Sequence, residues 1–512
     1  MLLAISVLLI SLSALFPLES VAGTYWVSPT GAAAWGACNG ETALSGTSAC
    51  SATTAFANAA AGDVVYFRGG EYRTPSRTSG SGNSGYYNPT NSGTGDADSQ
   101  RIIFRAYSRI IMTEPRAVFN GTKGGSADGV GNCFANIMAT SGKDYITIDG
   151  FTFISDDGRW MARVFLGGLD GSDYSNYINF TNNIMDGGYY GCNVADNEEG
   201  LRVNTSNYVN VSHNVFQNYR SRWEGGASLG GTTATKCYTC NYTTYDGNFF
   251  QNNTVAMYDK DRGDHTTVRN SFFVNSDVCY QASDNTHFQI NGTLSNNVCY
   301  SSLYRGLSAS TNGQAVDSYL NDWTINNNTI YTTRTQAQTL GNGNEITKQQ
   351  SLTFKSTMAD GAQRASIYNN IVQGPTTGNE YSGSVRFAEQ ITNGITNTII
   401  NDYNNYGSPM AVIGPTNGSV SSTIASLQAK TIMALTTGNH NQSSIASAPS
   451  FVNATGGYYL PSDFKLTGGS AGTNAGNDGH DMGANTDSVW HPTPFRKPMT
   501  EALRVAKTAL AP

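Results

Sequence analysis

The chain has 512 residues, of which 39% are hydrophobic, only 13% are charged and 56 are glycine. This composition excludes a coiled coil or helical bundle, and 28 tyrosines with 21 phenylalanines supply more core material than a disordered chain contains. The formal net charge of −7 leaves no basic excess to hold a phosphate backbone, so nucleic-acid binding is not expected.

Residues 1–22 are predicted to be a secretory signal peptide. Residues 1–16 are all apolar or small, and the small-x-small sequence from Ser20 to Ala22 follows, although no Lys or Arg precedes the run. A membrane anchor is the alternative, but the run is shorter than the ~20 residues of a span, and no second such run follows. We therefore expect a monomeric protein, secreted or at the cell surface, with no membrane span.

The cysteines agree with export. The chain has eight, an even number, which predicts disulfides in an exported protein. Proximity in the sequence favours pairing Cys38 with Cys50 and Cys279 with Cys299. Cys237 and Cys240 form a CxxC pair that lacks a second pair of zinc ligands nearby, so a disulfide or two buried thiols is favoured over a zinc site.

A six-residue motif recurs through the middle of the chain. Each copy reads apolar, polar, small polar, Asn-like, and then two mostly apolar residues, and successive copies lie 23 to 42 residues apart. The copies are Ile148–Phe153, Phe180–Met185, Val211–Phe216, Tyr245–Phe250, Val268–Phe273, Leu294–Cys299, Ile325–Ile330 and Ile367–Val372. A fixed motif with elastic spacing indicates a solenoid with loops of different length between its strands.

The motif also indicates the type of solenoid. Its period-2 alternation predicts strands, and no apolar stretch has a helical period. The paired Asn residues suit a turn between two short strands, because Asn tolerates a left-handed backbone. Stacked from coil to coil, their amides can form an internal ladder. We therefore predict an all-β, single-stranded, right-handed parallel β-helix with an N-terminal cap and long inserted loops.

Three segments carry a resemblance to a known family. They are Thr24–Gly31 with Ala61–Tyr72, then Ile146–Phe151, and finally the closing stretches Pro449–Val452, Asp463–Leu466 and Asp481–Ala484. Together the chain resembles right-handed parallel β-helix proteins of the pectate-lyase-like superfamily, of the polysaccharide lyase type. The resemblance implies the fold and a carbohydrate-related role, because the same fold hosts lyases, hydrolases, epimerases and adhesins.

The mature chain is expected to have three parts. Residues 24–100 are predicted to form the N-terminal strand, the cap and a loop rich in Gly, Ser and Asn. Residues 101–410 are predicted to form the β-helix coils, and residues 411–512 the last coils and the closing segment.

Basic residues recur at comparable places in the predicted coils. If Leu201 and Val203 face inward, then Arg202 faces outward, and the same alternation turns Lys355 and Arg386 outward. We predict that Lys355 and Arg386, with Tyr258 and Gln281, bind substrate along a groove. Ordinary solvated surface residues would give the same pattern.

The densest cluster of charges runs from Asp259 to His265. A polysaccharide lyase must neutralise a uronate carboxylate, remove the neighbouring proton and assist the leaving oxygen. We predict Arg202, Lys260, Arg262 and His265 as catalytic residues. The carboxylates Glu198, Glu199, Asp259 and Asp261 are expected to bind Ca²⁺ through oxygen ligands, and no organic cofactor is expected.

A family resemblance bears on the same cluster. Arg262–His265 with Val268–Phe273 resembles the active coil of alginate and chondroitin lyases on this fold. The Glu-x-x-Lys of the preceding coil in those lyases is not evident here, so the resemblance leaves the base unassigned. A solvated charged turn is the alternative interpretation.

The predicted function is therefore a secreted lyase, or a related epimerase, acting on an acidic polysaccharide. A non-catalytic polysaccharide-binding protein or adhesin remains open, because it needs only the groove and the many tyrosines. A glycoside hydrolase is a third possibility that requires paired carboxylates, and the residue set of polygalacturonases is missing from the sequence.

Overall fold

The computed structural model describes most of the mature chain. The described residues are 22–75, 85–121, 134–155, 161–167, 174–188, 198–220, 232–260, 263–284, 289–300, 305–311, 320–331, 350–356, 364–373, 383–389, 398–407, 411–413, 419–421, 444–445, 447–453 and 460–492. The predicted signal peptide falls almost entirely outside these ranges. Within them, no helix is long and apolar enough to cross a membrane.

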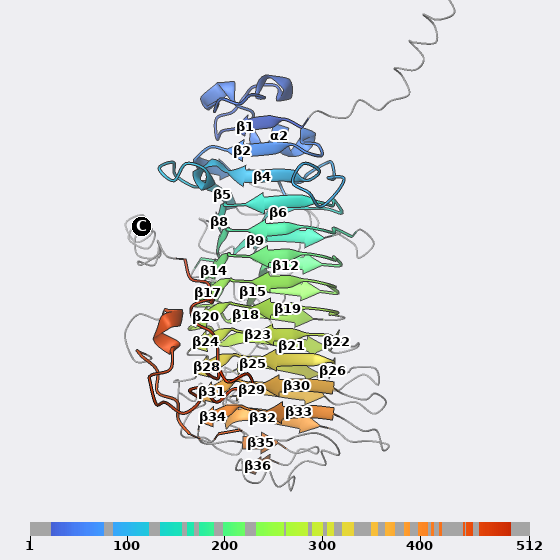
Figure 1. Ribbon diagram of the computed structural model, residues 1–512. Helices are drawn as coiled ribbons and strands as arrows, with labels where there is room; N and C mark the ends of the chain where they lie inside the picture. The colour runs from blue at the N-terminus through green and yellow to red at the C-terminus, as the bar shows by residue number, and fades with distance from the viewer. Residues whose placement is uncertain are drawn as a thin grey trace, which may run out of the picture.

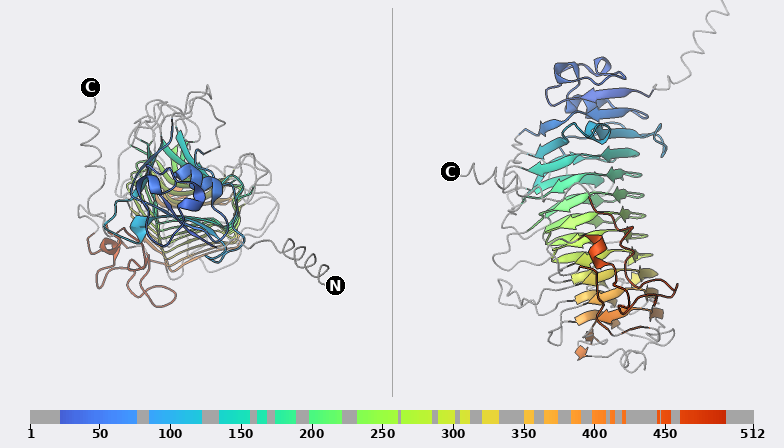
Figure 2. Two further views of the ribbon diagram at one scale, coloured as in Figure 1. Left: turned by 90° about the horizontal axis from the view of Figure 1, so that it is seen from above. Right: turned by 60° about the vertical axis from the view of Figure 1, so that its left-hand side comes forward.

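The described strands form three tall sheets whose neighbouring strands all run parallel, which confirms the predicted parallel β-helix (Figure 1). Seen along its long axis, the molecule has a three-sided outline (Figure 2). Each full coil supplies one short strand to each sheet, so residues far apart in sequence become neighbours along the axis.

The twelve-stranded sheet contains β1 (Thr24–Val27), β2 (Val64–Phe67), β4 (Ile102–Ala106), β7 (Ile146–Asp149), β10 (Asn179–Thr181), β13 (Asn210–Ser212), β16 (Thr244–Asp246), β19 (Thr267–Arg269), β23 (Thr293–Ser295), β27 (Trp323–Asn326), β30 (Arg364–Tyr368) and β33 (Thr398–Asp402). The eleven-stranded sheet contains β3 (Gly70–Arg73), β5 (Ala117–Gly121), β8 (Thr152–Ser155), β11 (Ile184–Asp186), β14 (Val215–Gln217), β17 (Phe249–Gln251), β20 (Phe272–Val274), β24 (Val298–Tyr300), β28 (Thr329–Tyr331), β31 (Ile371–Gln373) and β34 (Asn405–Gly407). The nine-stranded sheet contains β6 (Phe134–Ala139), β9 (Met161–Gly167), β12 (Glu198–Asn204), β15 (Thr232–Tyr238), β18 (Val255–Lys260), β21 (Val278–Asp284), β25 (Arg305–Thr311), β29 (Gln350–Ser356) and β32 (Gly383–Glu389).

The remaining elements are short. Two small sheets pair β22 (Gln289–Ile290) with β26 (Leu320–Asn321) and, antiparallel, β35 (Ala411–Ile413) with β36 (Ser419–Ser421). Among the described residues, the helical elements are α2 (Ala52–Asn58) and the single 3-10 turns η1 (Trp35–Ala37), η2 (Gly46–Ser48), η3 (Tyr107–Arg109) and η4 (Pro461–Phe464).

The repeated motif marks the corner between the twelve- and eleven-stranded sheets. In the copy Ile325–Ile330, the strand β27 ends at Asn326, Asn327 adopts a left-handed backbone with φ of 54°, and β28 begins at Thr329. Between them Asn328 is fully buried. The same left-handed position is held by Asn182, Asn270, Asn296 and Asn369 in other coils. Asn is favoured there because its short polar side chain tolerates this conformation.

The buried Asn of each copy forms the expected internal ladder. In the lower coils it runs through Asn297, Asn328, Asn370 and Asn404, where each side-chain amide donates to the Oδ1 of the next at 2.9–3.0 Å. Each amide also donates to a backbone carbonyl, for example Asn328 Nδ2 to Leu294 O at 2.9 Å. The ladder amides therefore bond both to each other and to the backbone of the neighbouring coil, which satisfies buried polar groups at every step.

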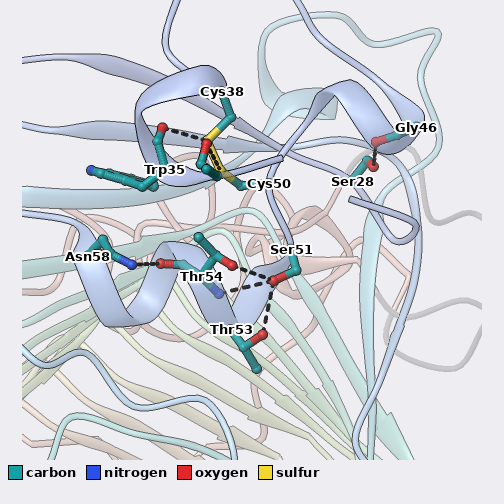
Figure 3. Close-up of a disulfide and its surroundings, with 10 residues drawn as sticks. Ser28, Trp35, Cys38, Gly46, Cys50, Ser51, Thr53, Thr54 and Asn58 are labelled. Carbon is teal, nitrogen blue, oxygen red and sulfur yellow. Dashed lines mark hydrogen bonds between the residues drawn. A yellow bond between two sulfur atoms is a disulfide. The ribbon is translucent and has the colours of Figure 1, made fainter. Parts of the chain in front are cut away.

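An N-terminal cap covers the first coils. The helix α2 starts at Ala52, where the Ser51 hydroxyl accepts a hydrogen bond from Thr54 N at 3.1 Å. The predicted disulfide between Cys38 and Cys50 is present beside it (Figure 3). The described residues also contain disulfides between Cys279 and Cys299, as predicted, and between Cys237 and Cys240, which decides the CxxC pair in favour of a disulfide.

The segment 460–492 runs back along the outside of the eleven-stranded sheet (Figure 2). Its Phe464 and Val489 pack into an apolar cluster on the outer face with Phe272 and Val298. Trp490 N donates to the backbone carbonyl of Asn270 at 3.0 Å. This segment thus shields apolar residues that the β-helix would otherwise expose.

Candidate functional site

Several basic residues of the middle coils lie on the outer face of the nine-stranded sheet. Leu201 and Val203 of β12 belong to the buried core, so Arg202 between them points outward, as the sequence predicted. Lys236 of β15 is in register with Arg202, and Tyr258 of β18 is in register with Lys236. Parallel pairing without a slip therefore places these outward side chains in one file along the axis.

Glu199 is the centre of an ion cluster on this face. The carboxylate is fully buried, and it lies 3.2 Å from Lys236 Nζ, 3.4 Å from Arg163 Nη2 and 3.7 Å from Arg202 Nη1. Arg163 and Lys236 are each 1% exposed, whereas the Arg202 side chain is 19% exposed. Of the three cations, Arg202 therefore has the most direct access to solvent.

Tyr238 joins the cluster to a fourth cation. The centroid of its ring lies 4.5 Å from Arg202 Cζ, 4.7 Å from Lys236 Nζ and 5.1 Å from Lys260 Nζ. The Lys260 amine also lies 3.4 Å from the Tyr238 hydroxyl. A ring that faces several cations is favourable because its π-face carries partial negative charge. We call Arg163, Glu199, Arg202, Lys236, Tyr238 and Lys260 the cation cluster.

Burial tunes the protonation of the cluster. It lowers the pKa of Lys236, an effect that the nearby Glu199 carboxylate opposes. It also lowers the pKa of Arg163 to about 10, which leaves this guanidinium charged at neutral pH. Burial, followed by the charge of Glu199, raises the pKa of Tyr238. The phenol therefore stays protonated at neutral pH and is able to donate a proton or a hydrogen bond.

Four residues predicted from the sequence come together on this face. Arg202 and Lys260 lie in the cation cluster, and Tyr258 packs near it, with its ring centroid 5.4 Å from Lys236 Nζ. Gln281 is in register with Tyr258 on the neighbouring strand β21. The strand order of the sheet therefore brings the coils that carry residues 202, 260 and 281 close to one another.

Two predicted metal ligands are placed differently from the expectation. Glu199 is enclosed by three cations, as described above. Asp259 is 1% exposed, is in register with the core residue Cys237, and has the Tyr280 hydroxyl at 3.5 Å. Its side chain therefore faces the interior, because it has the same parity on β18 as the core residue Met257.

Several predicted residues lie partly or wholly outside the description. Arg262 and Asp261 are outside the described residues, and so is the side chain of Glu198 at the start of β12. For Lys355 and Arg386 the strand register is described but the side chains are not. Five and six strand steps separate them from β12, about 24 and 29 Å at the usual strand spacing. They are therefore too far away to touch the same sugar as Arg202.

His265 lies at the corner that follows the nine-stranded sheet. Its Nδ1 is 2.7 Å from Asp264 Oδ1, and its ring stacks on Tyr242 with a centroid distance of 4.4 Å. Its backbone is left-handed, with φ of 56°. Asp264 and His265 thus lie in a turn where the His265 ring stacks on the ring of the neighbouring coil. The catalytic role predicted for His265 stays a prediction.

Sequence reasoning missed Arg163 and Lys236. Both are outward residues of strands, β9 and β15, in which the sequence analysis predicted no site residue. In β15, Thr232–Tyr238 lacks the alternating apolar residues of its neighbours. The available signal was the spacing from Lys236 to the next motif copy at Tyr245, which resembles the spacing from Arg202 to Val211. Aligning coils on the motif would have placed Lys236 beside Arg202.

In the described part of the chain, no group of three or more His, Cys, Asp or Glu side chains is arranged to hold a metal ion. The predicted Ca²⁺ site therefore gains no ligand set from those residues, and its remaining carboxylates are the ones outside the description.

Comparisons with known proteins give structural neighbours only. No family model matches the chain, and no curated protein matches it. Among solved structures, the chain is similar to the pectate lyase Pel9A, with 15% identity over 90% of this chain and 95% of that chain and a TM-score of 0.48. It is also similar to a mannuronic acid specific polysaccharide family 6 lyase from human gut microbiota, with 13% identity over 75% of this chain and 86% of that chain and a TM-score of 0.34. A third similar structure is PfbA, a surface adhesin of Streptococcus pneumoniae, with 9% identity over 70% of this chain and 86% of that chain and a TM-score of 0.32. The fold assignment rests on the three parallel sheets, and similarity this low carries no activity to the chain.

Proposed function

We propose that the protein is an exported polysaccharide lyase that cleaves a uronic-acid-containing polymer by β-elimination on the outer face of the nine-stranded sheet. The observation that carries the proposal is the convergence of four cations and a protonated phenol on one face of a chain with only 13% charged residues. The disulfides support export, because such bonds persist in oxidising compartments.

The cation cluster has groups for each step of a β-elimination. Arg202 neutralises the uronate carboxylate, because a guanidinium fork bonds both carboxylate oxygens and is accessible at this position. Lys260, on the same outer face as Arg202, is the base that takes the proton from the carbon beside that carboxylate. The Tyr238 hydroxyl, 3.4 Å from the amine, donates a proton to the leaving oxygen.

The buried members of the cluster hold this arrangement in place. Arg163 and Lys236 both contact Glu199, and all three residues are at most 1% exposed, so they act on a ligand through their charge and not by direct contact. Lys236 also packs on the Tyr238 ring and fixes its position. Ca²⁺ remains part of the proposal, with Glu198 and Asp261 as its carboxylate ligands, to be tested by assays with and without a chelator.

The test is turnover of polygalacturonate and alginate, measured as the ultraviolet absorbance of the unsaturated product. Lys260→Ala is expected to lower turnover by ~100-fold or more, the scale of losing a general base, and Tyr238→Phe is expected to lower it as well. Lys465→Ala is the matched control, because Lys465 is an exposed lysine paired with Asp487 on the C-terminal segment. Full turnover of a folded Lys260→Ala variant would refute the assignment.

A non-catalytic polysaccharide-binding protein or adhesin is the second candidate. The burial of Arg163, Glu199 and Lys236 favours it, because cations that do not touch the ligand still attract a polyanion. Wild-type protein that retains polymer but releases no unsaturated product would select this candidate. Reducing ends without unsaturated product would instead indicate hydrolysis, and a changed uronate composition without cleavage would indicate epimerisation.

A further inference from the structure

A ladder of aromatic rings runs along the corner that follows the nine-stranded sheet. Tyr145, Tyr177, Tyr208, Tyr242 and His265 come from five successive coils and stack face to face. The centroid distances are 4.7, 4.7, 4.9 and 4.4 Å, and the interplanar angles are 7°, 7°, 10° and 18°. We call these five residues the aromatic ladder.

The ladder occupies positions where a large ring is locally unfavourable. All five residues have a left-handed backbone, with φ between 51° and 57°. The next two coils place Asn291 and Asp322 in the same conformation ahead of the corresponding strands. A left-handed backbone costs a residue with a Cβ roughly 1–2 kcal/mol, and Asn or Asp offsets part of this by local hydrogen bonds. Four tyrosines in a row at such positions therefore need a favourable contribution from the rings themselves.

Stacking buries the faces of the rings against each other, but the edges of several rings stay exposed to solvent. Tyr208 is 46% exposed and Tyr242 is 43% exposed, and the His265 side chain is 41% exposed. Tyr174, three residues before Tyr177, is 49% exposed. Stacked rings cover each other's faces, so their free edges and phenol hydroxyls are what they present to solvent.

The ladder and the cation cluster belong to the same coils. Tyr208 follows the end of β12 at Asn204 by four residues, and Tyr242 follows the end of β15 at Tyr238 by four residues. His265 follows the end of β18 at Lys260 by five residues. The ladder therefore runs parallel to the long axis beside the strands that carry Arg202, Tyr238 and Lys260.

We propose that the exposed edge of the aromatic ladder is a second binding surface for the acidic polysaccharide, an inference that rests on the proposed function. A polymer lying along the axis meets the cation cluster with its carboxylates and the ladder with its neutral hydroxyls. The hydroxyls of Tyr208 and Tyr242 exchange hydrogen bonds with sugar hydroxyls. The cations select the charge of the polymer, and the ladder fixes its direction along the axis.

The decisive variant is the double substitution Tyr208→Phe with Tyr242→Phe, because it keeps the stack and removes only the two exposed hydroxyls. Two lost hydrogen bonds predict a dissociation constant raised at least ~5-fold for polygalacturonate or alginate, measured by affinity electrophoresis and calorimetry. The double substitution Tyr208→Asn with Tyr242→Asn removes the rings as well and is expected to weaken binding by at least as much.

Tyr403→Asn is the matched control. Tyr403 also has a left-handed backbone, with φ of 52°, but it lies at the other corner, where the neighbouring coil holds Asn369. Its substitution is expected to leave binding unchanged. Unchanged affinity of the folded Phe double variant overturns the ladder proposal. If Lys260→Ala weakens binding while the Phe variant does not, the ladder proposal alone fails; if the wild type binds neither polymer, the proposed function fails and the ladder proposal falls with it.

Discussion

Removing one member of the Asn ladder tests whether the ladder holds the coils together. The side chain of Asn328 makes four hydrogen bonds: its Nδ2 donates to Leu294 O and to Asn370 Oδ1, and its Oδ1 accepts from the backbone N and the Nδ2 of Asn297. The residue is fully buried, so water cannot replace these partners. Asn328→Ala keeps the backbone and deletes all four bonds.

The structure sets the expected size of the effect. After the substitution, Asn297 Nδ2 keeps its bond to Val268 O, and Asn370 Oδ1 keeps its bond from Asn328 N. Asn297 N and Leu294 O each lose the bond that the Asn328 side chain supplied. Leu294 O still belongs to the ladder between β23 and β27, so Asn297 N is the group left without a partner. Leaving a buried polar group unsatisfied costs about 1–3 kcal/mol, which is the expected loss in the free energy of unfolding.

Equilibrium unfolding in guanidinium chloride measures this loss, with the slope of the transition checked to be unchanged. Asn326→Ala is the control. Asn326 is the last residue of β27 in the same motif copy, is only partly buried and donates to Asn327 Oδ1, and its loss is expected to cost no more than about 1 kcal/mol. If Asn328→Ala costs no more than Asn326→Ala, the ladder is not a source of stability and the reasoning is refuted.

Two further predictions concern buried ionisable groups. Glu199→Gln leaves buried cations without their shared carboxylate and is expected to lower the free energy of unfolding by about 3 kcal/mol. The control Asp487→Asn changes an exposed residue and should alter the free energy of unfolding by less than about 0.5 kcal/mol. Equal losses in the two variants would contradict a stabilising role for the buried Glu199 carboxylate. Burial lowers the pKa of His491 from its usual 6.5 despite the opposing charge of Asp463, so the unfolded chain binds a proton more readily than the folded one and stability falls as the pH drops below about 6.5. Unfolding midpoints of wild type and His491→Gln measured on both sides of that pH should differ in this slope, and parallel curves would show that His491 does not contribute.

The sequence was sufficient for the fold because the fold is local and repetitive. Each motif copy encodes one corner by itself: an apolar residue that points inward, a left-handed residue such as Asn327, and a buried amide such as Asn328. Stacking identical corners then fixes the register of the parallel sheets. The disulfide between Cys38 and Cys50 was predictable for the same reason, since its partners lie 12 residues apart in one cap.

The site depended on contacts that no local pattern encodes. The direction of Arg202 followed from alternation within one strand, but its partners Glu199, Arg163 and Lys236 come from three coils separated by loops of different length. The same alternation gives Asp259 the opposite direction to Arg202, because its position on β18 points its side chain toward Tyr280 in the interior. The sequence by itself determined the coil and the alternation of its strands. Only the stacking of the coils decided which charges meet, because strand pairing brings residues more than thirty positions apart to within one strand spacing of each other.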